Sequence, residues 1–413
     1  MPKTHPTSPT GISRRRMLAA SAALIALPAP YVRSQPAGPI RVGFPVPLTG
    51  AYREEALDQV RGAKVAIAMF NEQGGLAGRK AELLVRDDKF DPATAIARTH
   101  ELIEKDQADF IVGGLSASVQ LAMNNVAKQK KVLFNSISQS DAIVALPDWA
   151  PTTFHQALTP HVTAGSVGRY VFANFGKRVA FLIADYAYGY EMLRGFEAIG
   201  KTAGIEVVAK VQHPLGTTDF SPYFPTIQAS KPDVLILCNF GRDQQLSIVQ
   251  ADKIGLKNSM RLVAPILLYT TRVLAGSSAF DGVVGGTSYY WRLEDTIPTA
   301  NVFNRRFRAM TEGRVPTSYG ALGFAGVLTV LTAAKNADSI ETAKVVDALA
   351  GMKYDLYKGP EYFRTCDHQA VQSVLIVESR ATVNPNDMDV FKILEVDPPD
   401  EAQLLACADE GHK

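Results

Sequence analysis

The pattern that most constrains the fold of this chain is a repeated alternation between short apolar strands and amphipathic helices. An apolar strand at Ile40–Val46 is followed by a helical face over 54–71 and by an alternating strand at Ala81–Arg86. Gly74-Gly75 stops the first helix, and Asp91-Pro92 caps the start of the next one. Parallel strands need crossover connections, which helices supply. The alternation therefore predicts an α/β fold with parallel sheets covered by helices.

The same alternation starts again after residue 158. Strands are predicted at Arg178–Ala184, Glu206–Gln212 and Asp233–Cys238, with helices between them. Two tandem copies of one plan predict two lobes of similar size. The elements after residue 300 are too few for a third sheet, so we expect them to return to these lobes, and the last residues have little periodicity. The predicted division is 39–157 plus 286–355 for lobe 1, 158–285 plus 356–380 for lobe 2, and 381–413 for a loosely packed C-terminal tail.

The N-terminal segment predicts export. Arg14-Arg15-Arg16 precede an apolar run from Met17 to Leu27, and small residues follow around Ser34. This is the plan of a cleavable signal peptide, and paired arginines are typical of the twin-arginine type. The run is too short for a membrane span, which needs roughly 20 apolar residues. We expect 1–34 to be cleaved near Ser34 and the mature chain to reach the periplasm; the alternative is an amphipathic N-terminal helix of the mature fold.

Charge and cysteine content argue against several classes. The chain has 43 Lys and Arg and 41 Asp and Glu, and without the five basic residues of 1–34 it has 38 basic and 41 acidic residues. This near-neutral balance argues against nucleic-acid binding, which needs a basic excess. No His or Cys pair has metal spacing, so we expect no metal and no cofactor. Cys238 lies in an apolar strand, and Cys366 and Cys407 can pair in an oxidising compartment only if their geometry permits it.

Several segments, in order along the chain, resemble type I periplasmic binding proteins of the leucine/isoleucine/valine-binding group. They include Val42–Gly50, Asn71–Lys80, Asp109–Ser118 and Ala184–Glu191, and the similarity runs from residue 39 to about 378. The resemblance implies two Rossmann-like lobes joined by three crossover strands. It also implies a monomer that catches a small molecule in the cleft and delivers it to an ABC transporter permease.

The first lobe offers hydroxyl groups at two strand ends. Ligands of open α/β sheets bind beyond the carboxyl ends of the strands, where helix N-termini present free N–H groups. The resemblance implies that Ser116 or Ser118 takes a ligand carboxylate, and the alternative for Ser118 is a helix N-cap. It likewise implies that Ser138 and Ser140 meet the ligand at the next strand end, unless they only form a turn. Amino-acid binders more usually carry Ala-Thr there, so these serines leave the ligand open.

The second lobe offers aromatic and charged side chains. The resemblance implies that Tyr188, with Tyr186 behind it, closes an aromatic ring over the ligand. Asp243 is the candidate partner of a ligand ammonium, and the adjacent Arg242 either neutralises it or favours a carboxylate ligand. For these residues the alternative is surface packing or a solvated helix start. Further candidates for the cleft wall, with core or hinge packing as the alternative, are Tyr52, Tyr269 and Trp291.

The sequence therefore predicts an exported solute-binding protein of an ABC importer, not an enzyme. No GxGxxG, GxxxxGK[ST] or GxSxG motif occurs, and Asp87-Asp88 fits a turn better than a catalytic pair. The expected solute is a branched-chain or other apolar amino acid. An amide, urea or an aromatic carboxylate remains open as the ligand. A sensor of the same fold and an exported α/β enzyme remain open as functions.

Overall fold

The computed structural model describes residues 1–4, 38–382 and 387–412. Gly38–Lys413 forms one compact unit, separate from Met1–Ala37. The predicted signal peptide lies outside the described residues except for its first four. Within the described part of the chain, no helix combines the length and the hydropathy that a membrane crossing requires.

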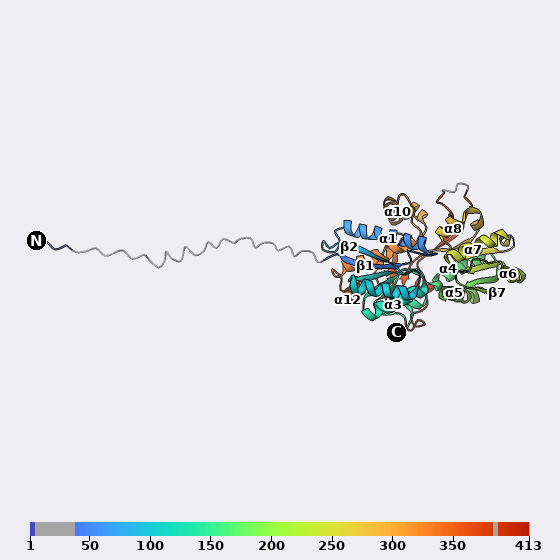
Figure 1. The fold of residues 1–413 in the computed structure, drawn as a ribbon, viewed down its shortest axis with the longest axis horizontal. Coiled ribbons are helices and arrows are strands. Elements are labelled where there is room, and N and C mark those ends of the chain that lie inside the picture. Colours follow the sequence, from blue (N-terminus) through green and yellow to red (C-terminus); the bar gives the residue numbers. More distant parts are fainter. Residues whose placement is uncertain (5–37, 383–386, 413) are drawn as a thin grey trace. The chain divides into compact units, whose positions relative to one another are not determined.

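A five-stranded sheet forms the first lobe. Its strand order is β2-β1-β3-β4-β5, and every neighbouring pair is parallel, as predicted. Figure 1 shows α1 and α3 on opposite sides of this sheet. The strands are β1 (Ile40–Val46), β2 (Ala81–Asp87), β3 (Phe110–Gly113), β4 (Leu133–Ser136) and β5 (Thr153–His155). The helices are α1 (Arg53–Glu72), α2 (Pro92–His100), the π turn η1 (Glu101–Lys105), α3 (Ala117–Lys130), η2 (Ala142–Val144), α10 (Pro298–Met310), α11 (Ser318–Asn336) and α12 (Thr342–Leu349).

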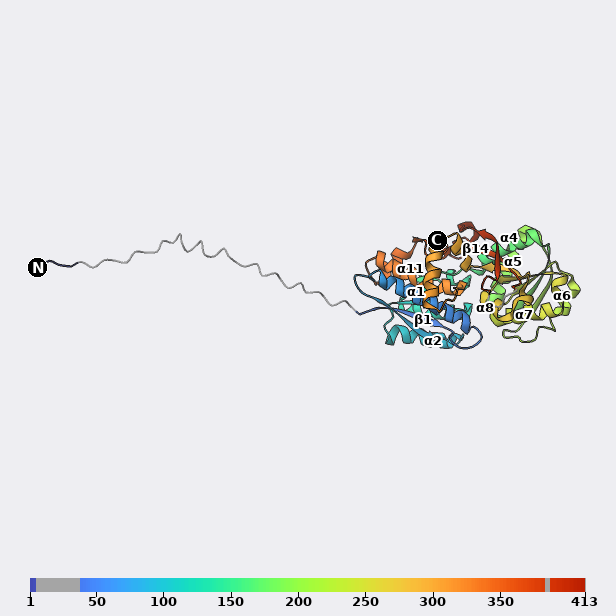
Figure 2. The same ribbon diagram turned by 90° about the horizontal axis from the view of Figure 1, so that it is seen from above.

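A seven-stranded sheet forms the second lobe. Its order is β15-β14-β10-β9-β8-β6-β7, parallel from β10 to β7 and antiparallel at β14 and β15. Figure 2 shows the two lobes side by side, with α1 and α11 in one and α6 and α7 in the other. The strands are β6 (Arg178–Ala184), β7 (Glu206–His213), β8 (Val234–Cys238), β9 (Arg261–Ile266), β10 (Val284–Thr287), β14 (Val374–Ser379) and β15 (Phe391–Asp397). The helices are α4 (Pro160–Asn174), α5 (Ala187–Ala203), α6 (Phe224–Ser230), α7 (Gly241–Lys253), η3 (Leu256–Asn258), α8 (Tyr269–Ala275) and α9 (Ser277–Phe280), with η4 (Trp291–Asp295) and η5 (Glu401–Gln403) in connecting segments.

Two predictions about the C-terminal third are wrong. The predicted loose tail after residue 380 contains β15, because its backbone pairs with β14 and extends the second sheet. Residues 356–380 do not all belong to the second lobe. A small antiparallel sheet, β11 (Lys353–Tyr354), β12 (Glu361–Phe363) and β13 (Ala370–Val371), lies beside β5 through a bridge between His155 and Gln369.

Local sequence signals explain where the first helices begin and end. Asp91 caps α2 by accepting a hydrogen bond from the backbone N–H of Thr94 at 2.7 Å, and Pro92 occupies the first turn. Gly74 and Gly75 follow α1 with positive φ angles, which a glycine adopts without strain. The helix therefore ends where the sequence predicted.

Close packing of α1 against α11 depends on glycine. A Cβ atom at Gly62 would lie 1.8 Å from the carbonyl oxygen of Gly320, and one at Gly323 would lie 2.0 Å from that of Gln59. Any larger residue at these positions would push the helices apart. These contacts hold α11, which lies between β10 and β14 of the second sheet in the chain, against the first sheet.

Three connecting segments cross between the two sheets, as the predicted fold requires. They are 156–159 after β5, 288–297 after β10 and 372–373 before β14. The Nζ atom of Lys358 donates hydrogen bonds to the carbonyl oxygens of Ser288 at 3.0 Å and Ser373 at 3.1 Å. A single buried ammonium therefore joins two of the three crossings.

The third crossing is tied to the same cluster. Lys358 also donates to the side-chain oxygen of Gln372 at 2.7 Å, and the Gln372 amide donates to the carbonyl of Gln156 at 2.6 Å. Glu361 lies 3.4 Å from the ammonium. Burial lowers the pKa of Lys358 and raises that of Glu361 to about 7. We call Lys358, Gln372 and Gln156 the hinge cluster.

Candidate functional site

A narrow pocket lies where the carboxyl ends of strands from both sheets face each other. Ligands of open α/β sheets bind at such edges. An adjoining pocket continues inward, and each leaves only about 20 Å³ of free space. That volume holds a water molecule but no larger solute, so a solute enters only when the lobes separate or the lining side chains move. The outer pocket is lined by Leu115, Ser116, Ala117, Ser138, Gln139, Tyr186, Tyr188, Phe240, Ile266 and Tyr319.

The start of α3 forms the first-lobe wall. Ser116 is the N-cap residue and lines the pocket, but its side chain makes no capping hydrogen bond. Its Oγ lies 3.0 Å from the Oγ of Ser118, which is exposed and does not line the pocket. The alternative of Ser118 as the N-cap is wrong, because the N-cap of α3 is Ser116, two residues earlier. The first turn of α3 thus keeps N–H groups that no side chain caps, next to the Ser116 hydroxyl.

The second serine loop divides between the pocket and the lobe interface. Ser138 lines both pockets, and its carbonyl accepts a hydrogen bond from Nε2 of His155 at 2.6 Å. Ser140 does not line either pocket. Its hydroxyl donates to Glu191 of α5 at 3.2 Å, so Ser140 joins the lobes instead. In this arrangement of the lobes Ser140 is turned away from the pocket, and its contact with a ligand stays a prediction.

Aromatic rings form the second-lobe wall. Tyr186 and Tyr188, both predicted, line the outer pocket, with ring centroids 5.9 Å apart. Tyr188 is 4% exposed, and its hydroxyl has no hydrogen-bond partner. Burial raises the pKa of Tyr188 well above its usual value, so the hydroxyl keeps its proton. This free donor lies in a pocket-lining side chain.

Sequence reasoning missed Phe240 and Tyr319. Their rings lie 5.9 Å apart across the pocket, and Phe240 lies 6.0 Å from Tyr188. Phe240 lies just after the buried strand β8, and this place at a strand end is a signal for a pocket residue. The charged residues after Phe240 carry the same signal, so position along the chain does not distinguish them. Tyr319 comes from the start of α11, far along the chain. No local pattern marks it.

Tyr52 packs behind Phe240 and joins the lobes. Its ring stacks on Phe90 at 4.1 Å and on Phe240 at 5.4 Å. A Cβ atom at Gly241, whose φ is +58°, would lie 2.1 Å from Cε1 of Tyr52. Gly241 is thus required both for its left-handed backbone and for the close approach of Tyr52 from the other lobe.

Neither charged candidate of the second lobe lines the pocket in this arrangement of the lobes, so the contact of each with a ligand stays a prediction. Asp243 is 3% exposed, and its carboxylate accepts a hydrogen bond from the backbone N–H of Gly216 at 2.9 Å. Burial raises the pKa of Asp243 to about 6. Arg242 is exposed. Because α7 begins at Gly241, the helix turns Asp243 toward the Gly216 loop of its own lobe and Arg242 toward solvent.

Tyr269 and Trp291 also lie away from the pocket. Tyr269 lines a separate cavity of about 280 Å³ together with residues of α1 and α8. The Trp291 indole donates to the carbonyl of Met388 at 3.1 Å and packs under the Arg308 guanidinium at 5.5 Å. These contacts belong to the segment after β10. Neither side chain lines this pocket, and a role of either in ligand binding stays a prediction.

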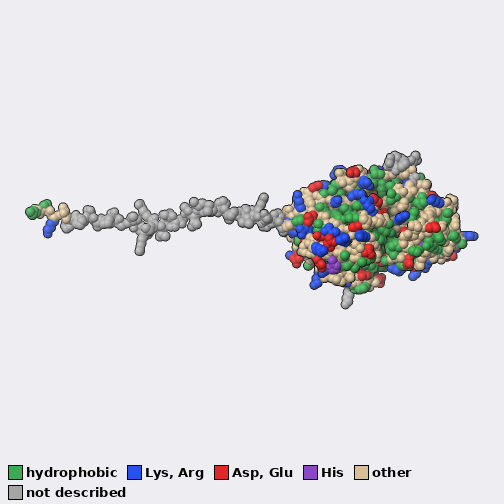
Figure 3. All heavy atoms as spheres, in the orientation of Figure 1, with side chains coloured by type: hydrophobic (Ala, Val, Ile, Leu, Met, Phe, Trp, Pro, Cys, Tyr) green, Lys and Arg blue, Asp and Glu red, His purple; other side chains and the backbone are tan. Residues whose placement is uncertain are grey.

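The lining of the two pockets is uncharged among the described residues. It combines hydroxyl groups, one amide side chain and aromatic rings. One group of described residues has side-chain atoms close enough to hold a metal ion, Cys366, Asp367 and Cys407, but its two cysteines form a disulfide. On the face shown in Figure 3, side chains of both charge signs are interspersed.

Comparison with known proteins confirms the resemblance. Residues 39–384 match the family model for periplasmic binding proteins. A Leu/Ile/Val-binding protein homolog of Brucella suis is 25% identical over 330 residues, which cover 78% of this chain and 82% of that protein. A Leu/Ile/Val-binding protein of Rhizobium johnstonii is 29% identical over 206 residues, which cover 48% of this chain and 53% of that protein.

Structural similarity agrees with this match. The crystal structure of a periplasmic binding protein from Burkholderia mallei is 27% identical, with a TM-score of 0.82, and the match covers 90% of this chain and 97% of that one. The two sheets, the crossings between them and the pocket at their facing edges correspond to the predicted architecture. The chain belongs to the periplasmic binding protein family.

Proposed function

We propose that this protein is the solute-binding component of an ABC importer in the periplasm and that it captures a small carboxylate with an apolar body. The observation that supports this proposal is the pocket between the lobes. On one side it has the uncapped start of α3, and on the other the side chain of Tyr188, whose buried hydroxyl has no partner. Both groups donate hydrogen bonds, and both lack an acceptor within the protein.

The start of α3 suits an anion. Free N–H groups and the helix dipole at an N-terminus favour negative charge, and α3 is a 14-residue helix. A carboxylate there would accept from these N–H groups and from the Ser116 hydroxyl. The rings of Phe240 and Tyr319 would then cover the apolar body, because aromatic side chains bury large areas at little conformational cost.

The uncharged lining argues against an ammonium group on the ligand. An ammonium moved from water into such a pocket loses its hydration without gaining an opposite charge. Asp243, the candidate partner, is engaged with Gly216, and the carbonyl of Ser138 already accepts from His155. A carboxylate that lacks an amine avoids this cost.

An apolar amino acid is the second candidate. Relatives in Brucella suis and Rhizobium johnstonii carry Leu/Ile/Val-binding names, which favours that ligand class. Here the ammonium would rest against aromatic faces and the side-chain oxygen of Gln139, which lines both pockets. An amide, urea or a sensor role of the same fold would use the same pocket.

Hinge closure would provide the transport signal. The solute would bind one lobe in an open form and then draw the other lobe over it, so the ligand stabilises the closed shape. A permease that binds the closed shape better than the open one would distinguish loaded from empty protein. One copy of the chain supplies both walls of the pocket, so we propose that it functions as a monomer.

A matched ligand series tests the proposal. Leucine, 4-methylpentanoate (leucine without the amine) and leucinamide (without the carboxylate) differ by one group each, and benzoate adds an aromatic carboxylate. We expect 4-methylpentanoate or benzoate to raise the melting temperature more than leucine does, because a ligand of the folded state stabilises it by mass action. A larger shift with leucine would favour the amino-acid candidate. A shift with leucinamide alone would overturn the carboxylate proposal.

A tyrosine variant tests whether this pocket is the site. Tyr188→Phe removes a buried hydroxyl that has no partner, so the unliganded protein should keep its stability or gain up to about 1 kcal/mol. Its ligand affinity should fall about tenfold, because the ligand loses a donor. Isothermal calorimetry with the best ligand of the series measures this. Tyr170→Phe, in α4 and outside the pocket lining, is the matched control, and equal affinities of all three proteins would place the site elsewhere.

A further inference from the structure

The C-terminal residues make a fourth connection between the lobes, in addition to the three crossings at the hinge. After β15 of the second sheet, residues 398–412 return to the first lobe. We call residues 398–412 the strap. Its two ends contact different lobes, so a change in the angle between the lobes has to stretch, bend or release it.

The second-lobe end of the strap is held by hydrogen bonds. The side-chain oxygen of Gln403 accepts from the Ser166 hydroxyl of α4 at 3.2 Å, and its amide donates to Asp397 at 3.1 Å. Asp397 in turn pairs with Arg169 of α4 at 2.5 Å. These contacts hold the start of the strap against the second lobe.

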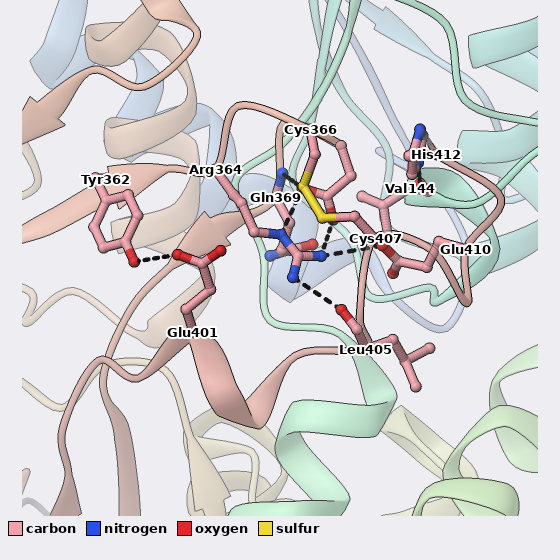
Figure 4. Close-up of a disulfide and its surroundings, with 11 residues drawn as sticks. Val144, Tyr362, Arg364, Cys366, Gln369, Glu401, Leu405, Cys407, Glu410 and His412 are labelled. Atoms are coloured by element: carbon pink, nitrogen blue, oxygen red, sulfur yellow. Dashed lines mark hydrogen bonds and ion pairs between the residues drawn. A yellow bond between two sulfur atoms is a disulfide. The ribbon is translucent and has the colours of Figure 1, made fainter.

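The first-lobe end is held by a covalent bond. Cys407 forms a disulfide with Cys366, with Cα atoms 6.3 Å apart, in the hairpin between β12 and β13 (Figure 4). This hairpin belongs to the first lobe. The backbone N–H of His155 in β5 donates to the carbonyl of His368 at 3.1 Å, and the His368 ring stacks on Phe154 at 4.1 Å.

A buried ion cluster surrounds the disulfide. Arg364 donates to the carbonyl of Leu405 at 2.8 Å and to the carboxyl group of Glu410 at 3.0 Å, and it also pairs with Asp367 (Figure 4). Burial and the charge of Asp367 raise the pKa of Glu410 to about 9, so this carboxyl keeps its proton at neutral pH. One guanidinium and one carboxylate then balance each other inside the cluster.

The end of the strap reaches beyond the hairpin. Nε2 of His412 lies 2.7 Å from the carbonyl of Val144, and the backbone N–H of Leu146 donates to the carbonyl of Glu410 at 2.9 Å. Val144 belongs to η2, which precedes the first crossing. The disulfide is the covalent member of this set, and the remaining contacts depend on the strap staying in place.

We propose that the disulfide-fastened strap is a redox-sensitive restraint on the angle between the lobes. With the bond formed, the strap limits opening and holds the ligand-free protein near the closed arrangement. A dithiol releases it by thiol–disulfide exchange. One thiolate attacks a sulfur, a mixed disulfide forms, and the second thiol resolves it, so the dithiol gives up two electrons and two protons and leaves Cys366 and Cys407 as thiols.

The restraint affects binding through pre-organisation. A protein already held near its bound shape loses less conformational freedom when the ligand arrives, so a released strap weakens affinity without touching the pocket. Disulfides persist in oxidising compartments such as the periplasm, which keeps the strap fastened there. This inference concerns the angle between the lobes and does not depend on the identity of the ligand.

Hydrogen exchange of the ligand-free protein, followed by mass spectrometry, tests the proposal. Samples are the oxidised protein, the dithiol-treated protein and Cys407→Ser. We expect exchange at 115–118 and 186–188, which face each other across the pocket, to rise at least about tenfold in both altered samples. The radius of gyration from X-ray scattering should rise as well. An increase confined to 364–369 and 398–412 would show a local anchor and overturn the proposal.

Two controls separate the bond from other effects. Dithiol treatment of Cys407→Ser should cause no further change, because the remaining described thiol outside this pair, Cys238, is buried in β8. Cys366→Ser should reproduce Cys407→Ser. If either variant fails to fold, the comparison of oxidised and dithiol-treated native protein gives the same answer. A dithiol effect that persists in a folded Cys407→Ser would contradict the proposal.

Discussion

The two sides of the interface between the lobes are built differently. On the pocket side, contacts across the interface include aromatic rings, as where Tyr52 lies on Gly241 and Phe240 faces Tyr319, and the hydrogen bond from Ser140 to Glu191. On the hinge side, buried hydrogen bonds of Lys358 and the Cys366–Cys407 disulfide hold the segments together. Water and a ligand can replace the contacts on the pocket side. They cannot replace the buried bonds on the hinge side.

The physical difference lies in the cost of separation. Aromatic contacts at a pocket re-form against a ligand of similar shape, so exchange of partners changes the free energy little. A buried ammonium cannot exchange its partners in this way. Removing it leaves its acceptors buried without a hydrogen bond, and each then costs its full desolvation free energy. Substitutions on the hinge side should therefore lower the free energy of unfolding, and substitutions on the pocket side should change ligand affinity.

The largest expected effect is on the hinge cluster. Lys358→Met removes the donor shared by Ser288, Gln372 and Ser373 and leaves Glu361 buried without its partner. We expect the free energy of unfolding in urea to fall by about 4 kcal/mol, as for other broken buried ion pairs. Lys353→Met, at an exposed position in β11, is the matched control and should change it by less than about 0.5 kcal/mol. Equal free energies of unfolding for the two variants would contradict the expected role of the hinge side in stability.

A smaller effect is expected where the lobes meet at the pocket. Gly241→Ala adds a Cβ atom against Tyr52 and places alanine at a φ of +58°. The backbone strain should cost about 1 kcal/mol of stability, and the contact should weaken ligand affinity about tenfold by holding the lobes apart. Gly204→Ala, with a φ of +67° and open space around it, carries the same strain without the contact. Calorimetry should find its affinity unchanged, and a similar loss in both variants would contradict this role of Tyr52.

The effect of pH on ligand affinity should be equal to or smaller than the effect of Gly241→Ala. Burial and the charge of Asp141 raise the pKa of Glu191 to about 7, and burial raises that of Asp141 to about 6. The Ser140 hydroxyl, the Asp141 N–H and the Arg194 charge act in the opposite direction on Glu191. Because opening returns Glu191 to water and to its lower pKa, the closed form binds the proton more tightly. Its advantage is complete below the open-state pKa and is lost as the pH rises through about 7.

This linkage predicts that ligand affinity falls up to about tenfold between pH 6 and pH 8. Titration calorimetry across this range measures it, with a ligand that does not itself titrate there. Glu191→Gln should flatten the profile, because the amide keeps a donor and an acceptor but does not titrate. A fall of the same size in Glu191→Gln would assign the pH dependence to another group.

Local signals predicted strands β1, β2, β6, β7 and β8 and the alternation of strands with helices. Asp91 and Pro92 begin a helix, and Gly74 and Gly75 end one, because capping and positive φ depend on neighbours in the chain. The C-terminal segment was misassigned because β15 has no pattern of its own. It becomes a strand only because β14 offers an open edge.

The pocket was predicted in part. Ser116, Ser138, Tyr186 and Tyr188 line it because each follows a strand at the edge where ligands of this fold bind. Ser140 does not line the pocket, because its hydroxyl donates to a buried carboxylate of the other lobe. Position along the chain predicts which loop reaches the pocket, but not which side chain of that loop enters it.

The sequence by itself determined the alternating elements, the duplicated parallel sheets and the edge at which the pocket lies. These follow from periodicity, caps and the rule that parallel strands need crossovers, all of which act over short distances in the chain. Only the tertiary structure decided that Asp243 turns to Gly216, that Tyr319 closes the pocket and that Cys366 meets Cys407. Each of these joins segments distant in the chain, and their contacts depend on helix rotation and lobe angle, which packing of the whole molecule sets.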